Sequence, residues 1–368
     1  MRRGRVLVDG AGGFLGSHVV EALIRSGYDV LATDLPGADA SVATAAGAQW
    51  QEADLLDVRA VRRLVAGCRA VVHVAGAFDF SLPWDALYAA NVDTTTNVCE
   101  AALEAGVEKF IHVSSTTVYG TPDKVPAPED SVQHPKHDYG KTKQRAEQEV
   151  WRYQRFRGLP AAVIRPASIY GPRSRYIMAS LFAMYSLSAR RSYPWLARLD
   201  GGARCHHVHV EDVAESVRLV LCQRESVGQV YNVGDRTPLR WGEVTQLLAG
   251  LANAPGPLWR ASALAMRAVR VAGALWPSSS LVEHNRMLAR DWDELVNQHG
   301  LSGAIQPRVD RDFFGYAAAD HVYDTTALER LGMQWRYPRT LDGLRATHRW
   351  YCDHNWLPRP GSGVGVQS

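Results

Sequence analysis

Short apolar runs alternate with longer amphipathic stretches through the first half of the chain. The amphipathic stretches carry apolar residues three and four positions apart, as one face of a helix does, and they cover Phe14 to Ser26, Val58 to Ala66, Trp84 to Ala105 and Tyr139 to Arg157. The apolar runs have the length of buried strands and cover Val6 to Val8, Val30 to Thr33, Ala70 to Val74, Phe110 to Val113 and Ala161 to Ile164. Alternating strands and helices build βαβ units, so the pattern predicts an α/β fold with a doubly wound parallel sheet.

The alternation loosens after about Pro166, where glycine and proline pairs separate shorter elements. We expect residues 1–165 to form the first domain and residues 166–360 mainly a smaller C-terminal α/β region that binds substrate. Strands and helices after residue 203 are expected to return to the first domain. Residues 361–368 are expected to be a disordered tail.

One insertion in the second half, at about residues 256–315, has an unusual pattern. The stretch Leu258 to Trp276 is largely apolar, yet Arg260, Arg267 and Arg270 fall on one side if it is helical. It is therefore expected to be an amphipathic helix that does not cross a membrane. Such a helix covers a binding pocket, lies on a membrane surface or docks on the protein's own core.

Composition excludes several classes of protein. The 368 residues are 46% hydrophobic and 21% charged, which is typical of a folded globular chain. The net charge of +3, from 41 basic and 38 acidic residues, is too balanced for a protein that mainly binds nucleic acid. The five cysteines form no C-x-x-C pair, so they predict neither a disulfide framework nor a thiolate metal site, and they fit a reducing cytoplasm. We expect no targeting or membrane-spanning segment.

A glycine-rich turn joins the first strand to the first helix. It places Gly10, Gly13 and Gly16, with Phe14 and Leu15 between the last two, where a backbone turns tightly beside a helix N-terminus. Such a turn can bind a pyrophosphate through its oriented N–H groups, although a simple strand-to-helix turn has the same sequence pattern. The position of this turn, after the first predicted strand and at the start of the first predicted helix, favours a dinucleotide-binding site.

The acid that ends the second strand indicates which dinucleotide binds. Asp34 lies 21 residues beyond Gly13, where a carboxylate accepts hydrogen bonds from ribose hydroxyls and repels a 2′-phosphate. NAD is therefore favoured over NADP; the alternative is a turn aspartate before Pro36.

Further loops follow the carboxyl ends of other predicted strands, the edge at which open α/β sheets bind ligands. They contribute Asp54 and Leu55, which follow a further strand before the helix at Val58, and Val74, Ala75 and Gly76, at the end of the strand Ala70 to Val74.

The strongest chemical signal is Tyr139 and Lys143, preceded by Ser115 in a Ser-Ser-Thr-Thr-Val-Tyr-Gly run. Four-residue spacing puts the tyrosine and the lysine on the same face of a helix. A nearby ammonium favours a phenolate, which makes a tyrosine a competent proton donor or acceptor. The chain has 36 Arg and only 5 Lys, so a lysine here indicates a chemical requirement, although all five lysines lie in this middle region.

Together these motifs resemble the extended short-chain dehydrogenase/reductases, the NAD-dependent epimerase/dehydratase group, over nearly the whole chain. The matching text includes Asn91-Val92, Arg165-Pro to Gly171-Pro172 and His209-Val-Glu-Asp-Val-Ala. The resemblance implies a Rossmann-type NAD-binding domain, Tyr139 as catalytic acid and base, Lys143 on the nicotinamide ribose and Ser115 on the reacting oxygen. It also assigns to the cofactor site Asn91, Val113, Pro166, Ala167, Ser168 and Ile169, and it makes a homodimer an expectation.

Three histidines, His206, His207 and His209, raise the question of zinc. A strand would turn His206 away from the other two, and no carboxylate or cysteine completes a ligand set. The sequence therefore predicts no metal site.

The substrate is the point on which alternatives stay open. The Arg204-Cys-His-His text departs from the pattern of nucleotide-sugar enzymes. Together with the Trp84 loop and the apolar Leu258 to Trp276 stretch, it is more similar to the 3β-hydroxysteroid dehydrogenase and sterol-4α-carboxylate dehydrogenase branch. A bulky lipophilic alcohol or ketone is the leading hypothesis, with peripheral membrane contact in addition. The alternatives are a nucleotide-sugar epimerase or dehydratase and a non-catalytic NAD sensor.

Overall fold

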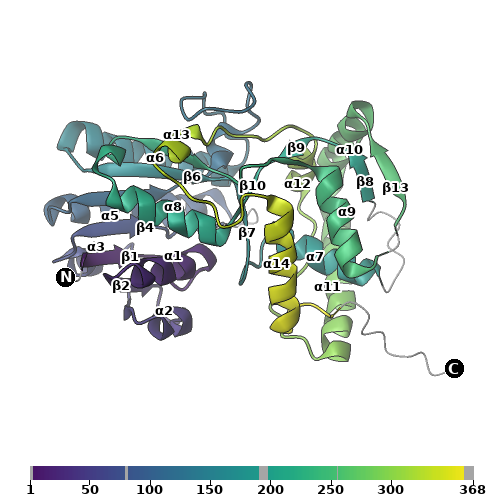
Figure 1. Ribbon diagram of the computed structural model, residues 1–368, viewed down its shortest axis with the longest axis horizontal. Coiled ribbons are helices and arrows are strands. Elements are labelled where there is room, and N and C mark those ends of the chain that lie inside the picture. Colours follow the sequence, from purple (N-terminus) through teal and green to yellow (C-terminus); the bar gives the residue numbers. More distant parts are fainter. Residues whose placement is uncertain (1–2, 79–81, 190–197, 255, 360–368) are drawn as a thin grey trace. The chain divides into compact units, whose positions relative to one another are not determined.

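The computed structural model describes residues 3–78, 82–189, 198–254 and 256–359 (Figure 1). It divides the chain into two compact units. Unit 1 comprises residues 1–169, 208–234 and 323–336, and unit 2 comprises residues 170–207, 235–322 and 337–368. The expected tail at 361–368 lies outside the described residues.

A seven-stranded sheet forms the centre of unit 1. Its order is β11-β6-β5-β4-β1-β2-β3 and its strands pair in parallel. The strands are β1 (Arg3–Val8), β2 (Tyr28–Asp34), β3 (Gln49–Glu52), β4 (Ala70–His73), β5 (Lys109–Val113), β6 (Ala161–Pro166) and β11 (Val230–Val233). The predicted doubly wound α/β fold is confirmed, and the strand order reverses direction between β1 and β4.

Helices cover both faces of this sheet because successive strand residues point to opposite sides. Val6 and Val72 face a core completed by α1 (Phe14–Arg25) and α8 (Val210–Cys222). Leu7 and Val71 face the other core, which α3 (Val58–Val65), α5 (Thr94–Glu104) and α6 (Asp138–Arg157) complete. The remaining elements of unit 1 are α2 (Ser41–Ala45), α4 (Trp84–Tyr88), the π-helical turn η1 (Ala89–Asp93), the 3₁₀ turns η2 (Thr116–Tyr119) and η3 (Arg224–Ser226), and α13 (Thr326–Arg330).

The predicted helices agree with the structure to within a residue or two, for local reasons. The Asp57 side chain caps α3 by accepting from the Arg59 and Ala60 N–H groups, and α6 ends at Gly158 in the left-handed conformation. The helix predicted over Trp84 to Ala105 is continuous but heterogeneous, since η1 separates α4 from α5. Such π-helical turns often occur at functional sites, and this one carries Asn91.

Unit 2 has its own core, in which Trp241 and Trp292 are fully buried large side chains. Its longer helices include α7 (Ile177–Ser188), α9 (Trp241–Ala252), α11 (Ser278–His299) and α14 (Thr340–Asp353). Its short strands are β8 (Arg198–Gly201), β9 (Arg204–Cys205) and β12 (Leu239–Arg240), and its shortest helix is α12 (Arg311–Ala317). Two more strands, β7 (Ser168–Tyr170) and β10 (His207–His209), lie where the chain passes from one unit to the other.

The stretch predicted as a single amphipathic helix is two elements, so that prediction was wrong at its start. Residues Leu258–Ala261 form β13, which pairs in parallel with β8. The helix α10 begins only at Ala263, because the Ser262 hydroxyl caps it by accepting from the Ala265 N–H. No described helix is both long and apolar enough to cross a membrane.

Candidate active site

The glycine-rich turn between β1 and α1 has no room for side chains at two positions. Gly10 has a φ of +60°, and a Cβ there would lie 2.8 Å from the Ala75 nitrogen. A Cβ on Gly16 would overlap the Gly10 carbonyl oxygen. The chain therefore passes unusually close to itself at the start of α1, where helical N–H groups lack partners within the helix.

Asp34, at the end of β2, contacts this turn. The Gly12 N–H donates to Asp34 Oδ2 at 2.9 Å, and the Leu35 N–H donates to Oδ1 at 2.8 Å. The carboxylate is half-buried, and each of its oxygens keeps a further lone pair. It is therefore held in place beside the glycine turn and can still accept from a ribose hydroxyl.

Asp54 and Leu55 shape the loop before α3. Asp54 is exposed and accepts from the Leu56 N–H at 2.9 Å, while Leu55 is buried. The Asn97 amide donates to the Leu55 carbonyl at 3.0 Å, which ties this loop to α5.

A buried acid that the sequence reasoning missed organises the loop after β4. Asp9 Oδ1 accepts from the Val74 and Ala75 N–H groups at 2.7 and 2.8 Å. Its other oxygen lies 2.7 Å from His73 Nδ1, and neither side chain is exposed. The predicted cofactor loop is thus attached to the residue that precedes Gly10. The available signal was an acid ending an otherwise apolar strand.

The side-chain amide of Asn91 is already engaged in hydrogen bonds within the protein. Its Oδ1 accepts from the Ala77 N–H at 2.9 Å, and its Nδ2 donates to the Ala77 carbonyl and to Thr142 Oγ1. Thr142 in turn donates to the Tyr139 carbonyl at 2.9 Å. The loop after β4 and the first turn of α6 are therefore held together through Asn91.

The predicted catalytic residues lie on α6 and at the end of β5. Lys143 is buried, and its Nζ donates to the Val113 carbonyl at 2.7 Å. Tyr139, one turn earlier, is half-buried and packs edge-on against Phe78, with 4.9 Å between ring centroids. Ser115 follows β5 and caps η2, where its Oγ accepts from the Thr117 N–H at 3.2 Å and from the Thr117 hydroxyl at 3.0 Å.

The electrostatics around Lys143 are dominated by its burial. Removal from water lowers the pKa of Lys143 to about 8, against the opposing attraction of Glu147 and Asp9. Burial, with the Lys143 charge adding to it, also holds the pKa of His112 well below its usual range. His112 is therefore neutral at physiological pH.

A buried ion pair fixes the helix that carries Tyr139 and Lys143. Glu147, the next residue along this face of α6, binds Arg165 of β6 through two contacts of 2.9 and 2.6 Å. Arg165 also donates to the Tyr119 hydroxyl at 2.6 Å. Helix α6 is thus bound to the sheet by an ion pair that is buried away from water.

The other predicted residues are placed at strand ends. Pro166 ends β6, the neighbour of β5, and the Ala167 N–H donates to the Val233 carbonyl at 2.8 Å; Ser168 and Ile169 follow in β7 and are half-buried.

The three histidines are buried, and His206 lies in a break between β9 and β10 rather than within one strand. Within the described part of the chain, no three His, Cys, Asp or Glu residues are grouped to hold a metal ion.

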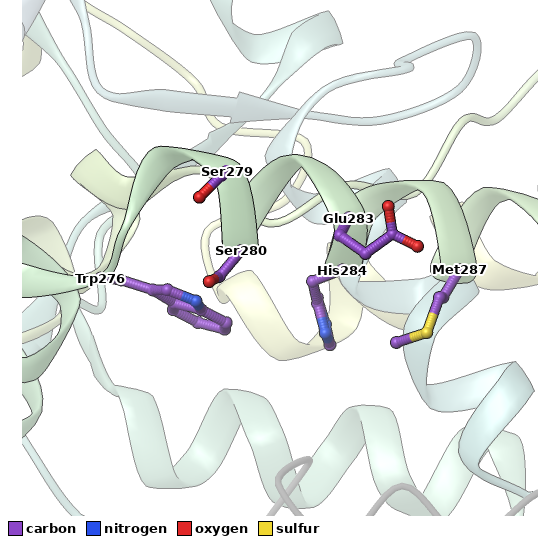
Figure 2. Close-up of a pocket in the computed structure, with 6 residues that line it drawn as sticks. All are labelled: Trp276, Ser279, Ser280, Glu283, His284 and Met287. Carbon is purple, nitrogen blue, oxygen red and sulfur yellow. The ribbon is translucent and has the colours of Figure 1, made fainter.

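Unit 2 contains a pocket of about 450 Å³ along α11 (Figure 2). Figure 2 shows Trp276, Ser280, His284 and Met287 pointing to the same side of the helix. Partial burial lowers the pKa of His284. None of the predicted site residues lines this pocket.

Several known proteins are similar to this chain in sequence. The family model described as "NAD dependent epimerase/dehydratase family" matches residues 6–234. The chain is 30% identical over 264 residues to a UDP-glucose 4-epimerase of Mycolicibacterium smegmatis, covering 68% of this chain and 83% of the epimerase. It is also 30% identical over 273 residues to the Arabidopsis thaliana 3beta-hydroxysteroid-dehydrogenase/decarboxylase isoform 1, covering 67% of this chain and 61% of that protein.

Solved structures show the same fold. A dTDP-glucose 4,6-dehydratase from Streptomyces venezuelae, solved with NAD bound, has a TM-score of 0.71 at 22% identity, with 96% of this chain and 99% of that chain covered. The UDP-glucose 4-epimerase of Thermotoga maritima has a TM-score of 0.70 at 22% identity, with 95% and 99% covered. The chain therefore belongs to the NAD dependent epimerase/dehydratase family, the extended short-chain dehydrogenase/reductase enzymes whose cofactor is NAD.

Proposed function

We propose that this enzyme transfers a hydride between NAD and a secondary alcohol or ketone on a bulky lipophilic substrate. The observation that carries the proposal is the placement of Tyr139 and Lys143 on one face of α6, with Lys143 bound to the Val113 carbonyl beside Ser115. The membership of an enzyme family speaks against the alternative of a non-catalytic NAD sensor.

The residues of unit 1 fit NAD. The absence of side chains at Gly10 and Gly16 leaves the backbone of the turn accessible to a pyrophosphate at the N-terminus of α1. The carboxylate of Asp34 would accept from the adenosine ribose hydroxyls and oppose a 2′-phosphate. When bound, NAD supplies the acceptor or donor of the hydride.

The chain's own residues would handle the proton and the oxygen. The Tyr139 hydroxyl would take the proton of a substrate alcohol, or return it to a ketone oxygen. Ser115 would donate a hydrogen bond to the same oxygen and stabilise its developing charge. The ammonium of Lys143 favours the phenolate form of Tyr139 and would donate to the nicotinamide ribose.

Two features support a lipophilic substrate. The Arg204-Cys-His-His sequence differs from the corresponding pattern of nucleotide-sugar enzymes. The Arg204 side chain is also held in an ion pair, with 2.8 Å between its Nε and Asp320 Oδ2. The sequence identity to a plant 3β-hydroxysteroid dehydrogenase/decarboxylase is 30%, the same as that to the mycobacterial epimerase, although a smaller share of the plant protein is covered.

The second candidate is a nucleotide-sugar epimerase or dehydratase, redox-neutral overall. It is favoured by the number of such enzymes among the relatives, including a dTDP-D-glucose 4,6-dehydratase of Mus musculus at 29% identity. A homodimer stays a prediction from the family resemblance.

One experiment separates the two candidates. Purified protein is incubated with NAD and with panels of sterols, other hydroxy-lipids and sugar nucleotides, while NADH absorbance and product mass are followed. Sustained NADH formation with a lipid alcohol supports the proposal, and a converted sugar nucleotide without net NADH supports the second candidate.

The catalytic assignment has its own test. Tyr139→Phe should abolish turnover and leave NAD affinity intact, whereas the matched Tyr153→Phe, on the same helix, should keep turnover. Undiminished turnover in Tyr139→Phe would contradict the assignment.

A further inference from the structure

Unit 2 exposes a concentration of large apolar side chains. Of sixteen exposed large apolar residues in the described chain, eight lie between residues 258 and 287. They are Leu258, Trp259, Leu264, Val269, Val271, Leu275, Val282 and Met287. Single exposed apolar residues need no explanation, but several on one face of one helix indicate an interaction surface.

Helix α10 (Ala263–Leu275) turns an apolar face outward as well as inward. Its inner face carries Met266 and Gly273, both buried, and a Cβ on Gly273 would meet the Phe314 ring of α12 at 2.7 Å. The Trp276 ring, just after the helix, also packs near Phe314, with 5.9 Å between centroids. This inner face of α10 therefore packs against the core of unit 2.

The outer face of α10 consists of Leu264, Ala268, Val271 and Leu275. Their spacing of four, three and four residues places them along one line of the helix, opposite Met266 and Gly273. Leu264 is 80% exposed and Leu275 is 74% exposed. We call these four residues the outer stripe; unit 2 leaves it open to solvent.

The charges beside the outer stripe are basic. Arg267 and Arg270 of α10 are exposed, and among the described residues neither belongs to an ion pair. Arg267 lies next to the outer stripe, and Arg270 lies farther round the helix on the same side. The sequence contains no Asp or Glu between Glu243 and Glu283. On the neighbouring strands, Arg260 of β13 lies in register with Asp200 of β8, so that acid offsets one of three arginines.

We infer that the outer stripe of α10, with the exposed Trp259 of β13 and the flanking arginines, docks the enzyme on the surface of an anionic lipid membrane. A helix of this kind lies in the plane of the interface, with its leucines in the acyl boundary and its arginine stems reaching back to the headgroups. Tryptophan favours the same depth. The positive charge of the arginines gives a higher affinity for anionic than for zwitterionic lipid.

The same charges disfavour a second copy of the chain as the occupant. In a symmetric dimer through this face, the same arginines of two copies would approach one another, and no acid of α10 would offset them. The inference rests on unit 2 alone and does not depend on which substrate unit 1 oxidises or reduces.

Vesicle co-sedimentation of the full chain tests the proposal. The probes are phosphatidylcholine vesicles with and without phosphatidylglycerol, at low and high salt. We expect binding to the anionic vesicles, weakened by salt and at least about ten-fold weaker without phosphatidylglycerol. Leu264→Ser and Leu275→Ser should each lower the partition coefficient about ten-fold, and Arg267→Gln about five-fold.

Two control variants distinguish binding through this surface from non-specific binding of the protein to vesicles. Phe156→Ser removes an exposed aromatic side chain of α6, and Arg63→Gln removes an exposed arginine of α3; both should bind vesicles as the wild type does. Thermal unfolding and NAD titration check that each variant is folded.

The proposal is overturned by absent binding to anionic vesicles or by equal binding of the Leu264 and Phe156 variants. It is also overturned if sedimentation velocity shows a wild-type dimer that Leu264→Ser dissociates, because the outer stripe would then be a subunit interface.

Discussion

Asp9 and His73 form a buried acid–base pair beneath the predicted cofactor loop, with 2.7 Å between Oδ2 and Nδ1. Nε2 of the same ring lies 2.9 Å from Thr95 Oγ1, whose hydroxyl donates to the Asn91 carbonyl at 2.7 Å. A hydroxyl has a single proton, so Thr95 accepts from His73 Nε2–H. A continuous hydrogen-bonded chain therefore joins the start of the glycine turn to Asn91.

Replacement of Asp9 should separate the charge of this pair from its hydrogen bonds. Asp9→Ala leaves His73 and the Val74 and Ala75 N–H groups without partners, and should lower the free energy of unfolding by about 3 kcal/mol or more. Asp9→Asn keeps an acceptor for both N–H groups and an N–H for Nδ1 of a neutral imidazole, so its cost should be about 1 kcal/mol. Urea denaturation measures both.

NAD affinity should follow the same order, because Asp9 holds the loop that the cofactor is expected to contact. Asp29→Ala, which removes a partly exposed partner of Arg5, serves as the control and should change neither quantity much. Equal losses in the Asn and Ala variants would show that the charge, not the hydrogen bonds, is what matters.

Lys143 should make stability depend on pH in a defined window. Burial lowers its pKa from 10.5 to about 8. Between those values the unfolded chain binds more protons than the folded chain, so the Lys143 contribution to stability rises with pH, by at most about 1.4 kcal/mol per pH unit. Lys143→Met removes this slope. Lys109, whose pKa burial also lowers to about 8, is common to both proteins and cancels.

The measurement is the free energy of unfolding of wild type and Lys143→Met from pH 7 to above pH 10. The advantage of the methionine variant should be largest near pH 7 and shrink as pH rises above about 8. A difference that does not vary with pH would mean that folding does not lower the pKa of Lys143.

The glycine turn offers a steric test with an internal control. A Cβ on Gly16 would overlap the Gly10 carbonyl oxygen, so Gly16→Ala should distort the turn, abolish measurable NAD binding and destabilise unit 1. Gly250 of α9 has nothing within 4 Å of a Cβ. There the same substitution should stabilise the protein by about 0.5–1 kcal/mol, since alanine loses less backbone entropy in a helix. Isothermal titration and thermal unfolding report the two effects, and NAD binding by Gly16→Ala would contradict the placement of the cofactor.

The sequence predicted five of the seven strands from apolar runs, because those strands are largely buried. β3 (Gln49–Glu52) and β11 (Val230–Val233) have no such run, and β3 is largely exposed. It predicted the proximity of Tyr139 and Lys143 because four residues on one helix is a local relationship. It could not predict that the Asn91 amide would be engaged by Ala77 and Thr142, since these contacts join segments distant in sequence. The helix expected from Leu258 failed because hydrophobicity does not distinguish a strand from a helix over four residues.

The Glu147–Arg165 pair supplies the last prediction, because it fixes the helix that carries the predicted catalytic residues. Glu147→Gln leaves a buried guanidinium unpaired and should cost about 3–5 kcal/mol of stability. Replacing both residues by methionine should cost less than that single change, since no uncompensated charge remains. The exposed pair Arg62–Glu104, with a similar contact of 2.7 Å, should show a far smaller coupling because water screens it. Double-mutant cycles by urea denaturation give both coupling energies, and turnover at saturating NAD should fall in Glu147→Gln as α6 loosens. Comparable coupling in the two pairs would show that burial does not determine the strength of the α6 contact.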